Sequence, residues 1–97
     1  MACVYILYSE KLDKFYIGAS ALDPKERLTG HNTERYENKF TSNGIPWTLF
    51  WHLDTPSLQV AFKIERHIKN MKSKTYICNL KRYPEISAKL LKNYVIS

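Results

Sequence analysis

Long apolar runs are missing from this sequence of 97 residues, and glycine, proline and cysteine are scarce. No apolar stretch approaches the roughly 20 residues of a membrane-spanning helix, so no membrane partner is expected. The first apolar stretch, residues 3–7, is too short for a signal peptide and has no basic region before it, which predicts a cytoplasmic location. Three glycines and four prolines leave little scope for disorder, and the length accommodates a single domain over residues 1–97.

The two cysteines, Cys3 and Cys78, are far apart in the sequence. In a cytoplasmic protein this pattern indicates reduced thiols with structural roles rather than a disulfide. His52 and His67 show no metal-ligand spacing with the cysteines, so we expect no zinc site and assign His67 to a basic helix surface.

Acidic residues are fewer than basic ones. The sequence has nine Asp and Glu and 15 Lys and Arg, so its formal net charge is +6. This excess of positive charge favours a polyanionic partner. It is concentrated between residues 63 and 82, where Glu65 is the only carboxylate and the basic residues are Lys63, Arg66, Lys69, Lys72, Lys74, Lys81 and Arg82. We take the first five as candidate nucleic-acid-binding residues, because such a stripe attracts phosphate without reading base sequence. The alternative is a solvated helix face.

Alternation of apolar and polar side chains predicts three β-strands, over residues 2–9, 14–19 and 47–53. The polar connection between the first two is too short for a crossover, so these strands are expected to form an antiparallel hairpin. Gly18, near the end of the second strand, suggests that another group approaches the backbone closely there. The period of two gives three sets of residues that share a face: Cys3, Tyr5 and Leu7; Val4, Ile6 and Tyr8; and Trp47, Leu49, Trp51 and Leu53.

Start signals and apolar periodicity predict three helices. The first covers residues 24–31 with Asp23 as its cap, the second runs from about residue 55 to residue 71, and the third begins near Pro84. Residues 33–44 are polar without a clear period and are expected to form a long loop. The order strand, strand, helix, strand, helix, helix predicts an α+β domain in which helices flank a small, mainly antiparallel three-stranded sheet.

Glu65 is the most informative single residue of the second helix. At about 100° per residue it falls in the same arc as the apolar positions Leu58, Ala61, Ile64, Ile68 and Met71. A carboxylate at the buried edge of a helix is costly unless it is paired or binds a metal. The alternative is a partly exposed Glu65 in an ion pair with a lysine or an arginine.

Four further residues are candidates for chemistry. Arg27 and His31 stand four residues apart in the first helix and therefore share a face. Arginine can hold a phosphate with two hydrogen bonds, and a neutral imidazole can take or relay a proton. The alternative is two solvated polar side chains on an amphipathic helix. Tyr5 and Tyr16 lie on the paired strands, where tyrosine more commonly serves for packing.

The strand residues resemble the signature of the GIY-YIG nuclease family. The second half of that signature is present as Tyr16-Ile17-Gly18, and the first half is reduced to Cys3-Val4-Tyr5, which keeps the tyrosine and loses the glycine. Small stand-alone members are similar in having a Val-Tyr-Ile-Leu strand, here Val4-Tyr5-Ile6-Leu7. The resemblance covers roughly residues 2–74, and the ordered set of motifs is more specific than any one of them.

The later marks of the family follow in the expected order. An arginine followed four residues later by histidine or tyrosine is matched by Arg27 and His31, and the metal-binding glutamate of a later helix is matched by Glu65. Many members carry an asparagine beyond that glutamate, which contacts substrate or supports the site. Asn79 is the nearest match for this catalytic asparagine, with Asn70 as the alternative.

The resemblance implies one divalent metal, Mg²⁺ or Mn²⁺, held chiefly by Glu65 and neutralising charge on the scissile phosphate. It implies Tyr5 as the general base for the attacking water, with His31 and Tyr16 orienting or relaying the proton. Arg27 would stabilise the charge that grows on the phosphate oxygens. A tyrosine ordinarily titrates near a pH of about 10, so a tyrosine base needs positive charge nearby. We therefore expect the five side chains to converge on one concave, water-accessible face.

The implied function is a metal-dependent DNA endonuclease that hydrolyses phosphodiester bonds. By analogy with stand-alone and repair-associated relatives, it would be selective for branched, nicked or damaged structures in DNA repair or recombination. One alternative is a non-catalytic nucleic-acid-binding module, which would have no need of a buried carboxylate beside phosphate. A second is a subunit that is active only with a partner protein or as a homodimer, with Trp47, Phe50 and Trp51 available for an interface.

Overall fold

A computed structural model describes residues 2–21, 23–32 and 43–96, and the strands lie where the sequence predicts them. Strands β1 (Ala2–Ser9), β2 (Lys14–Ser20) and β3 (Trp47–Thr55) form a three-stranded sheet in the order β2-β1-β3. Both pairings are antiparallel, which confirms the hairpin of β1 and β2. β1 is therefore the central strand, and residues on both of its faces are buried.

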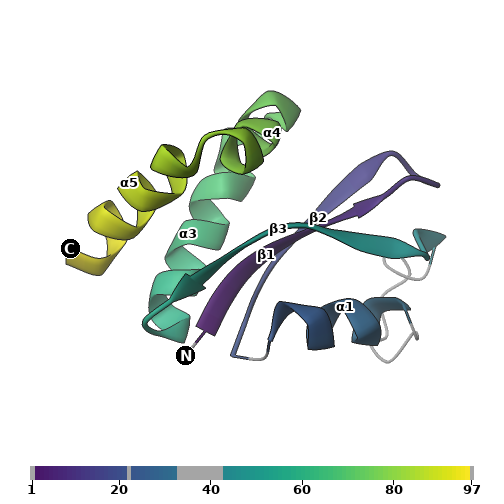
Figure 1. Ribbon diagram of the computed structural model, residues 1–97, viewed down its shortest axis with the longest axis horizontal. Helices are drawn as coiled ribbons and strands as arrows, with labels where there is room; N and C mark the ends of the chain where they lie inside the picture. The colour runs from purple at the N-terminus through teal and green to yellow at the C-terminus, as the bar shows by residue number, and fades with distance from the viewer. Residues whose placement is uncertain (1, 22, 33–42, 97) are drawn as a thin grey trace.

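Helices cover the two faces of the sheet unequally (Figure 1). Helix α1 (Pro24–Asn32) lies on one side, and α3 (Leu58–Met71), α4 (Lys74–Arg82) and α5 (Pro84–Ile96) lie on the other. The predicted α+β class is confirmed. The second predicted helix starts later than expected, because residues up to Thr55 belong to β3 and the Ser57 hydroxyl accepts the Val60 N–H as the cap of α3. Of the predicted long loop, residues 33–42 lie outside the described residues.

Helix α4 is an element that the sequence prediction missed. Its only buried residues are Ile77 and Leu80, one helical turn apart within a lysine-rich segment, so the apolar period was too short to recognise. The helix begins at a clear cap, because the Ser73 hydroxyl accepts the Tyr76 N–H at 3.1 Å. The preceding residue, Lys72, adopts a left-handed conformation that ends α3 and turns the chain.

A β-bulge in β3 corrects the predicted face of that strand. Ile6 pairs with Trp51, but Leu7 pairs with Leu49, so Phe50 is an extra residue on β3. The extra residue reverses which side chains of β3 face each side of the sheet. The expectation that Trp47, Leu49, Trp51 and Leu53 share a face is therefore wrong. Trp47 and Leu49 face α1, whereas Trp51 and Leu53 face the other helices.

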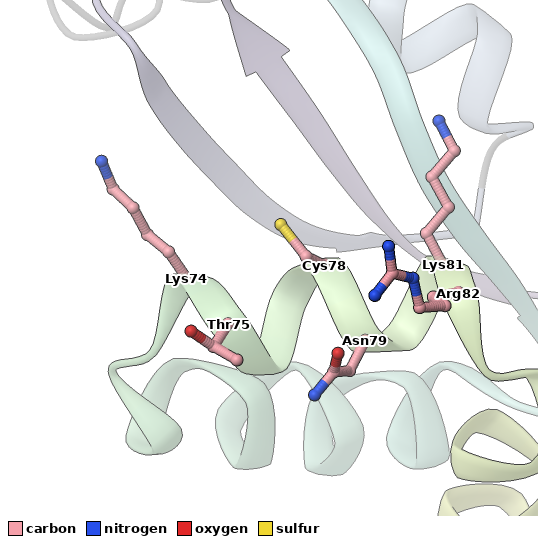
Figure 2. Close-up of a pocket in the computed structure, with 6 residues that line it drawn as sticks. All are labelled: Lys74, Thr75, Cys78, Asn79, Lys81 and Arg82. Atoms are coloured by element: carbon pink, nitrogen blue, oxygen red, sulfur yellow. The ribbon is translucent and has the colours of Figure 1, made fainter.

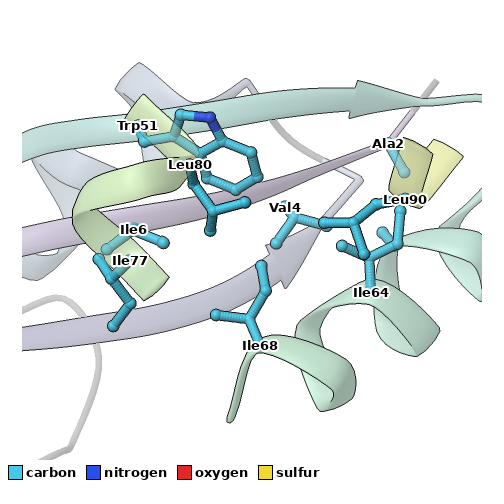
Figure 3. Packing of buried hydrophobic residues seen from close by; sticks show 10 residues of the cluster. Ala2, Val4, Ile6, Trp51, Ile64, Ile68, Ile77, Leu80 and Leu90 are labelled. Atoms are coloured by element: carbon cyan, nitrogen blue, oxygen red, sulfur yellow. The ribbon is translucent and has the colours of Figure 1, made fainter. Parts of the chain in front are cut away.

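The larger core lies between the sheet and α3, α4 and α5 (Figure 3). It contains Ala2, Val4, Ile6, Trp51, Ala61, Ile64, Ile68, Ile77, Leu80 and Leu90. A smaller cluster on the α1 side contains Cys3, Tyr5, Leu7 and Trp47. The predicted alternation along β1 is thus confirmed, and it assigns Tyr5 to the α1 side of the sheet.

Both cysteines are free thiols, as predicted. Cys3 is buried, and its burial raises the pKa of the thiol, while Cys78 is exposed on α4. In the part of the chain that the structure describes, no helix combines the length and the apolar character needed to cross a bilayer.

Truncating Leu80 tests whether α4 belongs to the cooperative fold. Leu80 is buried against the larger core, so Leu80→Ala should lower the free energy of unfolding by about 2–5 kcal/mol in urea titrations. Leu58→Ala, at an exposed leucine of α3, is the matched control and should cost much less. Equal effects of the two changes would mean that α4 is not part of the unfolding unit.

Candidate active site

Tyr5 lies at the centre of the candidate site, packed against the backbone of the neighbouring strand. It is paired with Gly18 across the β1–β2 ladder, and its side chain has 0% exposure. A Cβ atom on Gly18 would overlap the hydroxyl and ring of Tyr5. The expected close approach to Gly18 is therefore confirmed, and the approaching group is the phenol of Tyr5 itself.

Helix α1 brings Arg27 and His31 onto the Tyr5 hydroxyl. The helix is capped by the Asp23 carboxylate, which accepts the Lys25 N–H at 2.8 Å. Arg27 Nε donates to the Tyr5 hydroxyl at 3.1 Å, and that hydroxyl lies 3.4 Å from His31 Nε2. The prediction that Arg27 and His31 share a face is confirmed.

Tyr16 joins the same cluster from β2. It lies two residues before Gly18 and so faces the same side of the sheet, with its ring centroid 4.8 Å from that of His31 and 6.4 Å from that of Tyr5. Burial raises the pKa of Tyr16, while the charge of Arg27 lowers it and that of Glu65 raises it. Tyr16 is therefore close enough to both charged side chains to respond to them.

Glu65 approaches this cluster from α3, on the other side of the sheet. Helix α3 packs along β2, the strand of Tyr16, at the edge of the sheet. The Glu65 side chain is 20% exposed, and its Oε2 lies 3.7 Å from Lys69 Nζ, one helical turn later. The alternative of a partly exposed glutamate in an ion pair with lysine is the arrangement found.

The donors near Glu65 fit a loosely held Mg²⁺ better than a closed metal site. Among residues 2–21, 23–32 and 43–96, no group of three or more His, Cys, Asp or Glu side chains is arranged to hold an ion. Mg²⁺ usually keeps several waters and binds through one or two carboxylates together with substrate phosphates. A single, partly exposed carboxylate at the edge of the tyrosine cluster meets that requirement.

His31 is held as a neutral imidazole. Its exposure is 2%, and burial lowers its pKa to about 4, with the charge of Arg27 acting in the same direction. A neutral ring can accept a proton at neutral pH. His31 is thus a candidate for relaying a proton, because the burial that keeps the ring neutral also disfavours its retaining one.

Asn32 and Trp47 support the cluster, and the sequence did not indicate either role. The Asn32 side chain donates to the Trp47 carbonyl at 2.9 Å and accepts the Trp47 N–H, so it joins the end of α1 to the start of β3. The Trp47 ring lies 6.2 Å from that of Tyr16. The link depends on how α1 packs on β3, for which the sequence carries no local signal.

The expectation of one water-accessible face is correct only in part. Tyr5 and His31 are buried, while Tyr16, Arg27 and Glu65 are partly exposed. The buried pair is covered by α1 and β2, because the phenol of Tyr5 lies beneath Gly18 and beside the helix. The cluster therefore presents only its outer members to solvent.

The remaining candidates lie on other surfaces. Asn79 lies on α4, which packs against α3, α5 and β3, and it lines a groove together with basic residues of its own helix. Asn70 lines a different hollow, with Lys63 and Arg66. The predicted basic stripe is therefore not one surface. Lys63 and Arg66 line this hollow, whereas Lys69 pairs with Glu65 on the flank of α3 that faces Tyr16.

His67 lines the same hollow as Lys63 and Arg66, as expected for a residue of the basic helix surface, and it is also held by two tyrosines. Its Nδ1 is 2.9 Å from the Tyr94 hydroxyl, and its ring packs at 5.9 Å from that of Tyr76. It thereby links α3 with α4 and α5. The pairing involves a residue 27 positions away, so the local sequence could not reveal it.

Comparison with known families finds a match that covers most of the chain. The family described as the GIY-YIG catalytic domain matches residues 1–78. Neither the curated proteins nor the solved structures include a match.

The lowered pKa of His31 makes stability dependent on pH. The folded-state pKa of about 4 lies below the unfolded value of about 6.5, so the stabilisation is complete above pH 6.5 and is lost as pH falls towards 4. Between pH 7 and pH 5 this loss should amount to about 2 kcal/mol in denaturant titrations, and it should be absent from His31→Gln. His52→Gln, at an exposed histidine of β3, is the control and should keep the wild-type pH dependence.

Proposed function

Because this chain belongs to the GIY-YIG family, whose members are nucleases, we propose that it is a divalent-metal-dependent endonuclease that hydrolyses phosphodiester bonds in DNA. The observation that carries the proposal is the hydrogen bond from Arg27 to the Tyr5 hydroxyl, beside neutral His31. Near this group, Glu65 acts electrostatically on Tyr16. A fixed cation can stabilise charge on phosphate oxygens, a neutral imidazole can take part in proton transfer, and a carboxylate can hold a metal ion.

Arg27 is assigned to the phosphate. A guanidinium carries five N–H donors in a planar fork, so the bond from Nε to Tyr5 orients the fork and leaves its geometry suited to phosphate oxygens. The charge that develops on these oxygens during water attack would then meet a donor whose position is already set by Tyr5.

Because Tyr5 is buried, we assign different roles to Tyr5 and Tyr16. A general base must reach its proton directly or through one water, and the resemblance implies Tyr5 for this role. Tyr16 is the more exposed phenol, so we assign to it the contact with the attacking water. His31, whose ring is adjacent to that of Tyr16, relays the proton and does not retain it, because its lowered pKa disfavours the imidazolium, and Tyr5 orients His31 and Arg27 through its hydroxyl.

Glu65 is assigned to the metal. When bound there, Mg²⁺ or Mn²⁺ would neutralise charge on the scissile phosphate and the leaving oxygen. The ion pair with Lys69 is not an obstacle, because the lysine is mostly exposed and surface pairs of this kind contribute about 0–1 kcal/mol. Glu65 can exchange that partner for a cation at small cost.

Selectivity for branched or unpaired DNA is part of the proposal. Phe62 is 47% exposed and precedes Glu65 by three residues, so it lies on the same flank of α3. The distance along the helix axis between the two is about 4.5 Å. An exposed aromatic ring this close to the carboxylate offers a stacking surface for a base that is not paired in a duplex.

Alanine substitutions at Glu65 and Arg27 separate cleavage from binding. Glu65→Ala should abolish metal-dependent cleavage, while metal-free DNA binding should persist or tighten because a negative charge is removed. Arg27→Ala should weaken binding and lower the cleavage rate on the order of 100- to 1000-fold, since it removes one transition-state contact. Cleavage of labelled DNA and fluorescence anisotropy measure the two effects.

Glu85→Ala, at an exposed glutamate of α5, is the control for loss of a carboxylate and should cut at the wild-type rate. Circular dichroism checks that each variant folds. If the wild-type protein binds DNA but cuts no substrate with Mg²⁺ or Mn²⁺, the chain is a non-catalytic binding module. If Glu65→Ala retains the wild-type rate, the metal site is elsewhere.

A panel of duplex, flapped, forked and single-stranded DNAs tests the proposed selectivity. The wild-type protein should cut flapped and forked substrates faster than intact duplex. Phe62→Ala should reduce that preference on the order of tenfold, because stacking of a base on an aromatic ring is worth about 1–3 kcal/mol. Met71→Ala, at a residue that is 45% exposed on another flank of α3, should leave the preference unchanged. A preference that survives Phe62→Ala would exclude the stacking role.

A further inference from the structure

An open groove of about 560 Å³ runs along α4, outside the cluster around Tyr5 (Figure 2). It is lined by Lys74, Thr75, Cys78, Asn79, Lys81 and Arg82. Figure 2 shows Lys74 at one end of the groove and Lys81 and Arg82 at the other, with the uncharged side chains between them. All six belong to one helix, so their spacing is set by the helix itself.

The charge of this groove is of one sign. Three of its six lining residues are cationic and none is acidic, and residues 66–84 contain no Asp or Glu at all. Among the described residues, no carboxylate lies within ion-pair distance of Arg82. Lys74 pairs with Asp13 at 3.8 Å, but both side chains are exposed, so the pair is weak. The groove therefore attracts anions.

The polar residues of the groove suit phosphate oxygens. Thr75 and Asn79 can each donate a hydrogen bond, as such side chains do in contacts to nucleic-acid backbones. The Lys81 Nζ lies 4.7 Å from the centroid of the Phe50 ring, and this cation–π contact fixes the position of the charge at the end of the groove. The lining thus combines cations with neutral donors and has no group that repels phosphate.

The length of the groove matches a strand of nucleic acid rather than a small anion. Lys74 and Arg82 are eight residues apart, which corresponds to about 12 Å along the helix axis. This length exceeds the size of one phosphate group, so more than one phosphate of a strand can contact the groove.

Along the chain, lysines connect the flank of α3 that carries Glu65 with the first residue of the groove. Lys69 lies one turn after Glu65, Lys72 ends α3, and Lys74 begins α4 at the lip of the groove. The turn between the helices is held by the left-handed Lys72 and by the Ser73 cap. A strand bound at Glu65 can therefore continue along these lysines into the groove.

We propose that the α4 groove binds the sugar–phosphate backbone of the DNA substrate several nucleotides away from the scissile bond, and that Asn79 belongs to this binding site rather than to the catalytic cluster. This inference rests on the proposed function for the identity of the substrate. The family match ends at residue 78. The part of the groove formed by Asn79, Lys81 and Arg82 therefore lies outside that match.

Removal of two charges from the groove tests the proposal. In metal-free anisotropy titrations of a short duplex, Lys81→Gln with Arg82→Gln should weaken binding about tenfold and reduce the salt slope by about 2, one unit for each lost phosphate contact. Lys89→Gln with Lys92→Gln removes the same charge from exposed positions of α5 and is the matched control. It should leave the salt slope close to that of the wild type.

Thr75→Glu provides a second variant that removes no packing contact. It places a carboxylate in the groove, so it should weaken binding as the double variant does, and Asn79→Asp should do the same. Thermal melts verify folding, since Lys81 also packs on Phe50. In cleavage assays the groove variants should raise KM and leave kcat within about twofold of the wild type, because a contact made equally in the ground and transition states affects binding alone.

The outcomes distinguish the groove from the catalytic proposal. Groove variants that bind like the α5 control, or an Asn79→Asp variant that loses kcat with unchanged KM, would overturn the inference even if the wild type cuts DNA. If the wild type cuts nothing, but the groove variants bind DNA more weakly than the control, the groove is supported and the endonuclease proposal fails. Binding is measured without metal, so the two results are independent.

Discussion

The packing of the Tyr5 phenol against the backbone of Gly18 is the constraint on which the candidate site depends. Tyr5 lies on the central strand with no exposed surface, so its hydroxyl must find its partners inside the protein. Those partners come from α1, where Arg27 donates to the hydroxyl and His31 lies beside it. The glycine makes room for the ring, the ring orients the arginine, and the helix closes over both.

The position of β2 at the edge of the sheet allows groups from the two faces to act together. Tyr16 belongs to the α1 side with Tyr5, whereas Glu65 comes from α3 on the opposite side. At a central strand the sheet would separate them, but at the edge the charge of Glu65 reaches Tyr16. The site is therefore built around an edge, with a buried inner half and a partly exposed outer half.

The charged residues of the molecule fall into two groups, one inside the candidate site and one on the surface of α3 and α4. Inside, burial and Arg27 keep His31 neutral, so an uncharged imidazole lies beside a fixed cation. Outside, the cations after Glu65 are exposed and mostly without acidic neighbours along α3 and α4. In the proposed function the first group serves the reaction at one phosphate, through its partly exposed members, and the second group holds the phosphates that lead to it.

The sequence by itself determined the three strands, the capped helix of Arg27 and His31, and the order of the site residues, because these depend on local periodicity and short spacing. Only the tertiary structure decided the rest. The extra residue Phe50 reverses the faces of β3, since a bulge depends on the partner strand and leaves no local pattern. Helix α4 forms because Ile77 and Leu80 find a core assembled from other elements. The burial of Tyr5 and the approach of Glu65 to Tyr16 likewise follow from long-range packing, which no neighbouring residue encodes.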